Sequence, residues 1–179
     1  MESDRLVRTV GGGRVLLVRA DITTIAVDAV INAANASLGG GGGVDGAIHR
    51  AAGPELMREL RERYQGCPTG SAVITGGGRL RARYVIHAVG PRWRDGNHRE
   101  PELLEAAYRS AFALAAEHGC ATVAAPAIST GIYGFPIELA APLAIGTAAA
   151  ALEAPDTSLR EITFALFSDS DLEVFARAL

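Results

Sequence analysis

Short apolar segments alternate with helix-like segments along most of this chain, and this alternation limits the possible folds more than any other feature. VLLV at 15–18 and DAVIN at 28–32 predict buried strands. Residues 101–118 have the apolar spacing of an amphipathic helix, and Gly119 is a typical stop signal. Strands that alternate with helices favour a largely parallel sheet covered on both faces, so we expect an α/β fold.

The remaining segments continue this pattern. We expect further strands at 71–75, 84–89, 121–125 and 161–167, and further helices from residue 44 and at 54–64, 136–152 and 169–178. A glycine-rich turn joins the strands at 71–75 and 84–89, which predicts an antiparallel pair and therefore a mixed sheet.

Length and composition exclude several classes of protein. A chain of 179 residues favours one domain, which we place over residues 1–179. The net charge of −3 gives no reason to expect general affinity for nucleic-acid backbone. No apolar stretch is long enough to cross a membrane, and the first residues do not resemble a signal peptide. Cys67 and Cys120 form no disulfide framework, so we expect a cytoplasmic protein.

The chain contains 17 arginines and no lysine. This composition is typical of a GC-rich genome, which we expect to be bacterial. It excludes a P-loop lysine, a Schiff-base lysine and a lysine general base.

Residues 32–49, NAANASLGGGGGVDGAIH, place five glycines between a predicted strand and a predicted helix. Each glycine loses more backbone freedom on folding than any other residue, so the run indicates either a loose loop or a backbone that approaches a ligand closely. Ligands of open α/β sheets bind beyond the carboxyl ends of strands, and a helix N-terminus attracts anions. We therefore expect a phosphate site, with a flexible loop as the alternative.

A second loop at 126–136, PAISTGIYGFP, also lies between a predicted strand and a predicted helix. Ser129, Thr130 and Gly131 offer hydroxyl groups and close backbone approach, and Tyr133 and Phe135 offer flat apolar surfaces. Two anion-binding loops at one sheet edge suit a pyrophosphate better than a single phosphate.

Two familiar motifs are matched only in part. Gly41, Gly43 and Gly46 fit GxGxxG, but a glycine run produces this match easily, and no acidic residue stands at a strand end about 20 residues later. Ser129 lies in a segment close to the nucleophile elbow of serine hydrolases, but all four histidines precede it, which is the wrong order for that fold. Cys67 has no neighbouring base that would activate it as a nucleophile.

Six segments, in order between about residues 14 and 175, resemble motifs of the macrodomain family. They are ADIT from Ala20, VDAVINAAN from Val27, GGGGVDGAIHRAAG from Gly40, GCPTGSAVIT from Gly66, VIHAVGP from Val85 and PAISTGIYGFP from Pro126. The combination is most similar to the MacroD-like ADP-ribosylhydrolases and O-acetyl-ADP-ribose deacetylases. Ala20, where many relatives have glycine, and Phe135, where tyrosine is frequent, depart from the pattern.

The resemblance implies a three-layer α/β/α sandwich around a mixed, mostly parallel six-stranded sheet, and a cleft that binds ADP-ribose. Asp21 would bond the adenine amino group beside Ile22, and Phe167 would stack on adenine, unless it is a core phenylalanine. The implied substrate-binding residues are Asp21, Ile22, Asn35, Gly41, Gly42, Gly43, Val44, Asp45, Ser129, Thr130, Gly131, Ile132, Tyr133 and Phe167.

The resemblance also implies catalysis by Asn35 and Asp45, which would position ribose hydroxyls and an attacking water at the distal ribose. Asp45 could accept a proton from the water or only orient it, and its alternative role is to cap the helix. His49, four residues after Asp45, could orient Asp45 or be structural, and we expect His87 to be structural. No metal-ligand spacing is present, so we expect neither a metal nor a cofactor. ADP-ribose, its conjugates and ADP-ribosylated proteins are the expected partners of a monomer that does not bind membranes.

Two alternatives remain open at this stage. The chain could be a reader module that binds ADP-ribose without turnover, although the presence of both Asn35 and Asp45 favours an enzyme. It could also remove ADP-ribose from modified nucleic acid, for which Arg79, Arg81 and Arg83 would supply local positive charge.

Overall fold

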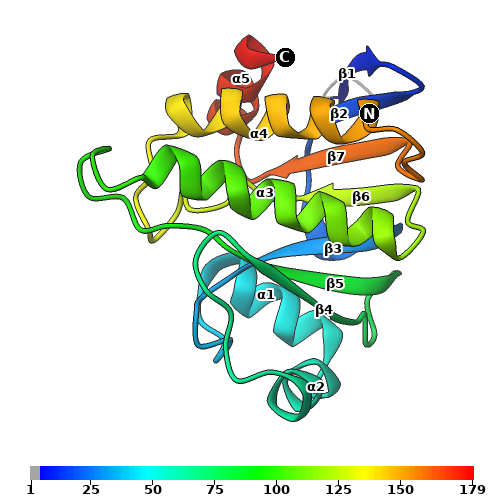
Figure 1. Ribbon diagram of the computed structural model, residues 1–179, viewed down its shortest axis with the longest axis vertical. Coiled ribbons are helices and arrows are strands. Elements are labelled where there is room, and N and C mark those ends of the chain that lie inside the picture. The colour runs from blue at the N-terminus through cyan, green and yellow to red at the C-terminus, as the bar shows by residue number, and fades with distance from the viewer. Residues whose placement is uncertain (1–4) are drawn as a thin grey trace.

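The computed structural model describes residues 5–179, which form a seven-stranded sheet with helices on both faces (Figure 1). The strands are β1 (Arg5–Val10), β2 (Gly13–Arg19), β3 (Val27–Ala34), β4 (Ala72–Gly76), β5 (Ala82–Val89), β6 (Thr122–Ala125) and β7 (Glu161–Leu166). Their order across the sheet is β1-β2-β7-β6-β3-β5-β4. The five central strands are parallel, while β1 and β4 run antiparallel at the two edges. The mixed α/β architecture and the antiparallel β4–β5 pair are therefore confirmed.

The helices cover the sheet in two layers. They are α1 (Gly43–Ala52), α2 (Glu55–Arg63), α3 (Glu100–Glu117), α4 (Ile137–Glu153) and α5 (Asp169–Ala178), with a short 3-10 helix η2 (Ile22–Thr24). Figure 1 shows α3 and α4 lying side by side across one face. No helix in residues 5–179 is both long and apolar enough to cross a membrane.

The side chains of β3 show how one strand serves both layers. Ala29 and Ile31 belong to the large core that includes α3, α4 and α5, whereas Val30 packs in a second core with Ile48 of α1 and Leu56 of α2. Successive side chains of a strand point to opposite faces, so a continuous apolar run such as that of β3 requires a helix layer on each side.

The prediction of six strands was wrong by one, because β1 was not recognised. Its sequence, RLVRTV, carries two arginines and a threonine, and only Val10 of its six residues is buried. An edge strand needs no continuous apolar run, and exposed charges protect it from pairing with other chains. The other predicted elements agree with the structure to within a few residues at each end.

The parallel strands all end at the same edge of the sheet, which brings the sequence motifs together. Figure 1 shows the arrowheads of β6 and β7 pointing the same way, toward this edge. The segments that follow the parallel strands are 20–21, 35–42, 90–99, 126–136 and 167–168. Every segment that was expected to bind a ligand therefore begins at this edge.

Candidate functional site

The glycine-rich loop after β3 is folded around the side chain of Asn35. Its Nδ2 donates to Gly40 O (2.8 Å), and its Oδ1 accepts from Ser37 Oγ (2.9 Å) and Gly39 N (3.2 Å). Gly40 (φ +82°) and Gly43 (φ +59°) adopt backbone conformations that favour glycine. The glycine run is therefore a turn held by hydrogen bonds rather than a loose connection.

Helix α1 packs tightly against this loop, and the side chains of Asn35 and Asp45 both lie near Gly41. A Cβ atom on Gly46 would lie only 2.6 Å from Gly41 O, so only glycine fits there. A Cβ atom on Gly41 would lie 3.5 Å from Asp45 Oδ2 and 3.8 Å from Asn35 Nδ2. The two side chains predicted to be catalytic thus flank the same point of the loop.

The carboxyl group of Asp45 is 6 % exposed and is held by two neighbours. Its Oδ1 accepts from Asn32 Nδ2 (2.9 Å) and lies 3.3 Å from His49 Nε2. Burial opposes the ionisation of Asp45, but the hydrogen bonds from His49 and Asn32 outweigh it and lower the pKa of this carboxyl below its ordinary value. Asp45 is therefore a carboxylate at neutral pH, and its Oδ2 lies nearest to Gly41.

Two side chains behind Asp45 were not assigned to the site from the sequence. Asn32 of β3 and His87 of β5 are paired in register and both are fully buried. His87 Nδ1 lies 3.2 Å from Asn32 Nδ2, and His87 Nε2 lies 3.0 Å from Thr75 Oγ1. Burial lowers the pKa of His87 to about 4. The available signal was a polar residue inside each of two apolar strand segments, DAVIN and YVIHAV.

Tyr108 of α3 anchors the loop that follows β6. The Tyr108 hydroxyl donates to Pro126 O (2.7 Å) and accepts from Ile128 N (2.8 Å). Ser129 then adopts a left-handed conformation (φ +69°), and its buried Oγ has no hydrogen-bond partner among residues 5–179. A Cβ atom on Gly90 would overlap Ser129 Oγ, so the segment after β5 passes directly beneath Ser129. The hydroxyl of Ser129 is therefore a buried, unpaired group at the base of this loop.

The rest of this loop reaches toward the glycine-rich loop. Ile132 is 83 % exposed, and a Cβ atom on Gly42 would lie 3.7 Å from its Cδ1. Thr130 Oγ1 donates to Ala127 O (2.8 Å), which uses the hydrogen of this hydroxyl within the loop. Tyr133 O accepts from Trp93 N (2.8 Å), which ties the loop to the segment after β5.

Phe135 does not offer the flat apolar surface that the sequence suggested. It is buried, and its ring packs edge-on against Trp93 with 4.9 Å between the ring centroids. The aromatic ring is needed to fill the space beneath the loop, so Phe135 belongs to the core.

Asp21 and Phe167 lie at the carboxyl ends of the paired strands β2 and β7, farther along the same edge of the sheet. Asp21 Oδ1 accepts from Thr23 N (2.9 Å) and Thr23 Oγ1 (2.7 Å), which caps η2 and places Ile22 in the core. These hydrogen bonds lower the pKa of Asp21. Phe167 is 92 % exposed, so the alternative of a core phenylalanine is wrong.

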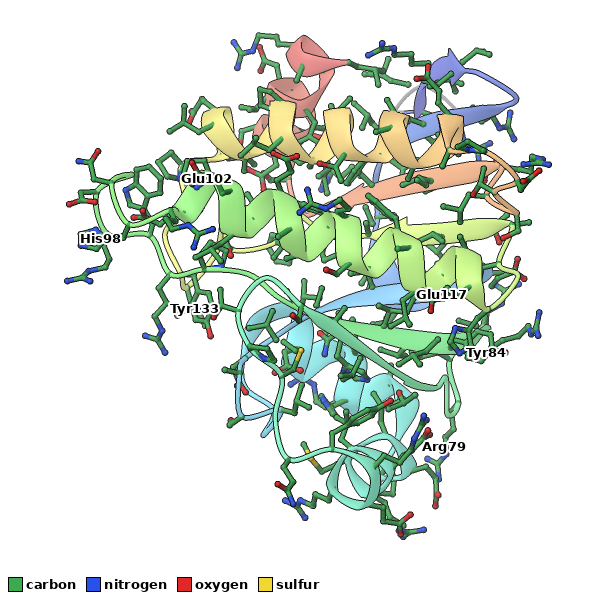
Figure 2. All side chains as sticks on the ribbon, in the orientation of Figure 1. Arg79, Tyr84, His98, Glu102, Glu117 and Tyr133 are labelled. Atoms are coloured by element: carbon green, nitrogen blue, oxygen red, sulfur yellow. The ribbon has the colours of Figure 1, made fainter. Side chains whose placement is uncertain are left out.

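One group of possible metal ligands, Asp95, His98 and Glu100, lies in the part of the chain that the structure describes. Burial opposes the ionisation of Glu100, but backbone N–H groups, first those of Arg94 and Gly96, outweigh it and lower its pKa to about 2. Asp95 Oδ1 accepts from His98 Nδ1 (2.8 Å). These ligand atoms are already used to fold the loop that carries His98, which lies toward the same end of the molecule as Tyr133 (Figure 2).

Residues 31–144 match the family model described as Macro domain. The chain belongs to the macro domain family. It is 56 % identical over 162 residues to a macro domain-containing protein of Chlorobaculum tepidum, covering 90 % of this chain and 93 % of the relative. It is 47 % identical over 169 residues to O-acetyl-ADP-ribose deacetylase 1 of Pantoea vagans, covering 93 % and 98 % of the two chains. The Trypanosoma brucei macrodomain in complex with ADP-ribose superposes with a TM-score of 0.84 at 40 % identity, covering 91 % of this chain and 68 % of that chain.

The family assignment confirms the resemblance drawn from the motifs. The matched range includes both loops that flank the site of this macro domain, while Asp21 and Phe167 lie outside it. Their position at the same sheet edge follows from the pairing of β2 with β7 and of β7 with β6.

Proposed function

We propose that this macro domain binds ADP-ribose and hydrolyses a linkage at its distal ribose. The reaction would remove ADP-ribose from acidic side chains of modified proteins, or acetate from O-acetyl-ADP-ribose. The observation that carries the proposal is that the side chains of Asn35 and an ionised Asp45 both lie beside Gly41, at the N-terminus of α1. A relative named O-acetyl-ADP-ribose deacetylase and a similar structure in complex with ADP-ribose support it.

The ligand would lie along the carboxyl edge of the sheet. Exposed Phe167 would stack on adenine, a contact worth about 1–3 kcal/mol per base in nucleic-acid complexes. Asp21 would accept from the adenine amino group through Oδ2, because its Oδ1 is held by Thr23, and the Ile22 backbone would lie beside the ring.

The two loops would enclose the pyrophosphate and the distal ribose. The N-terminus of α1 favours negative charge and presents backbone N–H groups. The unpaired hydroxyl of Ser129 would donate to a phosphate oxygen. The residues that would line this part of the cleft are Gly41, Gly42, Gly43, Val44, Ser129, Thr130, Gly131, Ile132 and Tyr133.

Asp45 and Asn35 would act on the water and the ribose hydroxyls. In the ester substrate, water adds to the acyl carbon, the bond from this carbon to the ribose oxygen breaks, and the ribose oxygen takes a proton. A carboxylate with a lowered pKa is a weak base, so Asp45 is better suited to orient water by accepting a hydrogen bond than to remove its proton. Asn35 would present its amide to the same ribose.

The substrate class can be decided by comparing initial rates on three compounds: acid-linked ADP-ribosylated protein, O-acetyl-ADP-ribose and ADP-ribosylated DNA. We expect turnover of at least one of the first two. Tight binding of ADP-ribose without turnover of any compound would identify a reader. Turnover of the ADP-ribosylated DNA alone would identify an enzyme that removes ADP-ribose from nucleic acid. The buried, unpaired Cys67 and Cys120 suit a cytoplasmic setting, and we propose that the domain acts as a monomer.

Replacing Asp21 tests the adenine contact. Asp21→Ala is expected to weaken ADP-ribose binding by about 1–3 kcal/mol, the cost of losing a hydrogen bond to a charged group. Asp21→Asn keeps an oxygen that can cap η2 but loses the second acceptor, so it should weaken binding similarly. Isothermal titration measures both. If only the alanine variant binds weakly, the side chain acts through the cap and not through adenine.

We expect hydrolysis to be independent of metal ions. Both carboxyl oxygens of Glu100, Asp95 Oδ1 and His98 Nδ1 form hydrogen bonds within their loop. Asp45 Oδ1 is held by Asn32 and His49. Dialysis against a chelator should leave the initial rate unchanged. A rate that falls on chelation and returns with zinc or magnesium would contradict this.

A further inference from the structure

The buried polar residues behind Asp45 admit only one arrangement of hydrogen atoms. A carboxylate can only accept, so Asn32 must present Nδ2 to Asp45 Oδ1, 2.9 Å away. The same nitrogen faces His87 Nδ1 at 3.2 Å and uses its second hydrogen there. His87 Nδ1 must therefore be the unprotonated nitrogen of the ring.

The other side of the imidazole continues the hydrogen bonds toward β4. His87 Nε2 carries the hydrogen and donates to Thr75 Oγ1 (3.0 Å), and this hydroxyl donates to Gly76 O (3.0 Å). Donation runs outward from Asn32 on β3, on one side to Asp45 on α1 and on the other side through His87 of β5 to Thr75 and Gly76 of β4. These hydrogen bonds tie the site carboxylate to three neighbouring strands of the sheet.

Burial and the neighbouring groups keep the imidazole of His87 neutral. Asp45 and His49 face it from α1, and Glu59 with its partner Arg63 faces it from α2. Burial and His49 lower the pKa of His87, and together they outweigh Asp45 and Glu59, which raise it. A neutral ring is what these hydrogen bonds require, because a protonated Nδ1 would point its hydrogen at the hydrogens of Asn32.

The oxygen of the Asn32 amide lacks a hydrogen bond. Its Oδ1 is buried and has no hydrogen-bond partner within residues 5–179. Leaving a buried carbonyl oxygen unpaired is unfavourable. A rotated amide would, however, set that oxygen against both Asp45 Oδ1 and His87 Nδ1, which are acceptors. The Thr75 hydroxyl donates to Gly76 O and can therefore only accept from His87, which keeps the hydrogen of the ring on Nε2 and makes Nδ1 an acceptor independently of Asn32. This acceptor and the Asp45 carboxylate together select the orientation in which Asn32 donates.

We propose that His87 is a positioning residue for hydrolysis: by accepting from Asn32 it fixes the amide that holds Asp45 Oδ1, and so keeps Asp45 Oδ2 beside Gly41, where the substrate would bind. The part of this inference that concerns turnover rests on the proposed function. The part that concerns the Asn32 amide and the ionisation of Asp45 does not, and it can be measured in the free protein.

Three variants separate positioning from packing. His87→Asn keeps an acceptor near the place of Nδ1, whereas His87→Leu removes the acceptor. Val85→Ala is the matched control, because Val85 lies on the same strand, its apolar side chain is buried in the core shared with α1, and it offers no hydrogen bond to Asn32. Thermal unfolding identifies the conditions in which each variant is folded.

The first measurement is the pKa of Asp45, which carbon-13 NMR of its carboxyl group determines. We expect His87→Leu to raise this pKa, because a freed amide no longer holds its N–H on the carboxylate, and we expect His87→Asn and Val85→Ala to leave it near the wild-type value. The second is hydrolysis of O-acetyl-ADP-ribose. His87→Leu should lower kcat about 10- to 100-fold, the range seen when hydrogen-bond partners that orient a metal ligand are removed, with KM nearly unchanged.

Each outcome decides the matter. An unchanged Asp45 pKa in folded His87→Leu overturns the proposal, as does an equal loss of kcat in Val85→Ala. If His87→Leu does not fold, Thr75→Val replaces it, because it removes the acceptor that orients the imidazole, and an unchanged Asp45 pKa in this variant overturns the proposal. If the wild type hydrolyses no substrate, the proposed function fails, and the NMR comparison still decides whether His87 positions Asn32.

Discussion

Asp45→Ala is expected to lower turnover by about 10²–10⁴-fold, the range for groups that orient or transfer a proton in the reaction. Most of the affinity for ADP-ribose should remain, because adenine and pyrophosphate would be held by Phe167, Asp21 and the two loops. Asp45 would act where the bond breaks, through the Oδ2 atom that lies beside Gly41.

Asn35→Ala should slow turnover comparably but should also weaken binding. The Asn35 side chain makes three hydrogen bonds that fold the glycine-rich loop, and alanine removes all of them. The two residues can therefore be distinguished by the ratio of the loss in rate to the loss in affinity.

Both variants should be assayed by single-turnover kinetics and isothermal titration on the same folded samples. Glu117→Ala is a suitable control, because Glu117 lies at the opposite end of the molecule from Tyr133 (Figure 2). Wild-type rates in Asp45→Ala would remove this residue from the catalytic machinery.

Gly46→Ala is expected to weaken ADP-ribose binding at least about tenfold and to slow turnover as well. Its Cβ atom would lie 2.6 Å from Gly41 O, so the glycine-rich loop would have to move away from α1. Alanine in a helix normally gains about 1 kcal/mol over glycine. Overpacking costs about 1–3 kcal/mol, and here the crowded atom belongs to the backbone of the proposed phosphate loop.

Gly146→Ala provides the matched control for this effect. Gly146 lies on the exposed side of α4, and a Cβ atom there would meet nothing within 4 Å. It should stabilise the fold by up to about 1 kcal/mol and leave binding unchanged. Denaturant unfolding and isothermal titration measure the two quantities. If Gly46→Ala binds ADP-ribose as the wild type does, the contact between α1 and the loop does not shape the site.

The regular elements could be predicted because their signals are local. A short run of apolar residues indicates a strand with buried side chains, and this identified the five parallel strands and β4. The strand that was missed, β1, has one buried residue and therefore lacks that signal. The gathering of Asn35, Asp45 and Ser129 at one edge was also predictable, since parallel strands end on the same side.

The sequence by itself determined the α/β architecture, the macrodomain motifs and the loops that would meet the ligand, because these depend on residues close together along the chain. Only the tertiary structure decided that Phe167 is exposed while Phe135 is buried, since burial depends on what packs over a side chain. It also decided the surroundings of Asp45. The register that sets Asn32 opposite His87, with Thr75 on the next strand, arises from pairing between distant segments, and no local pattern in the chain encodes it.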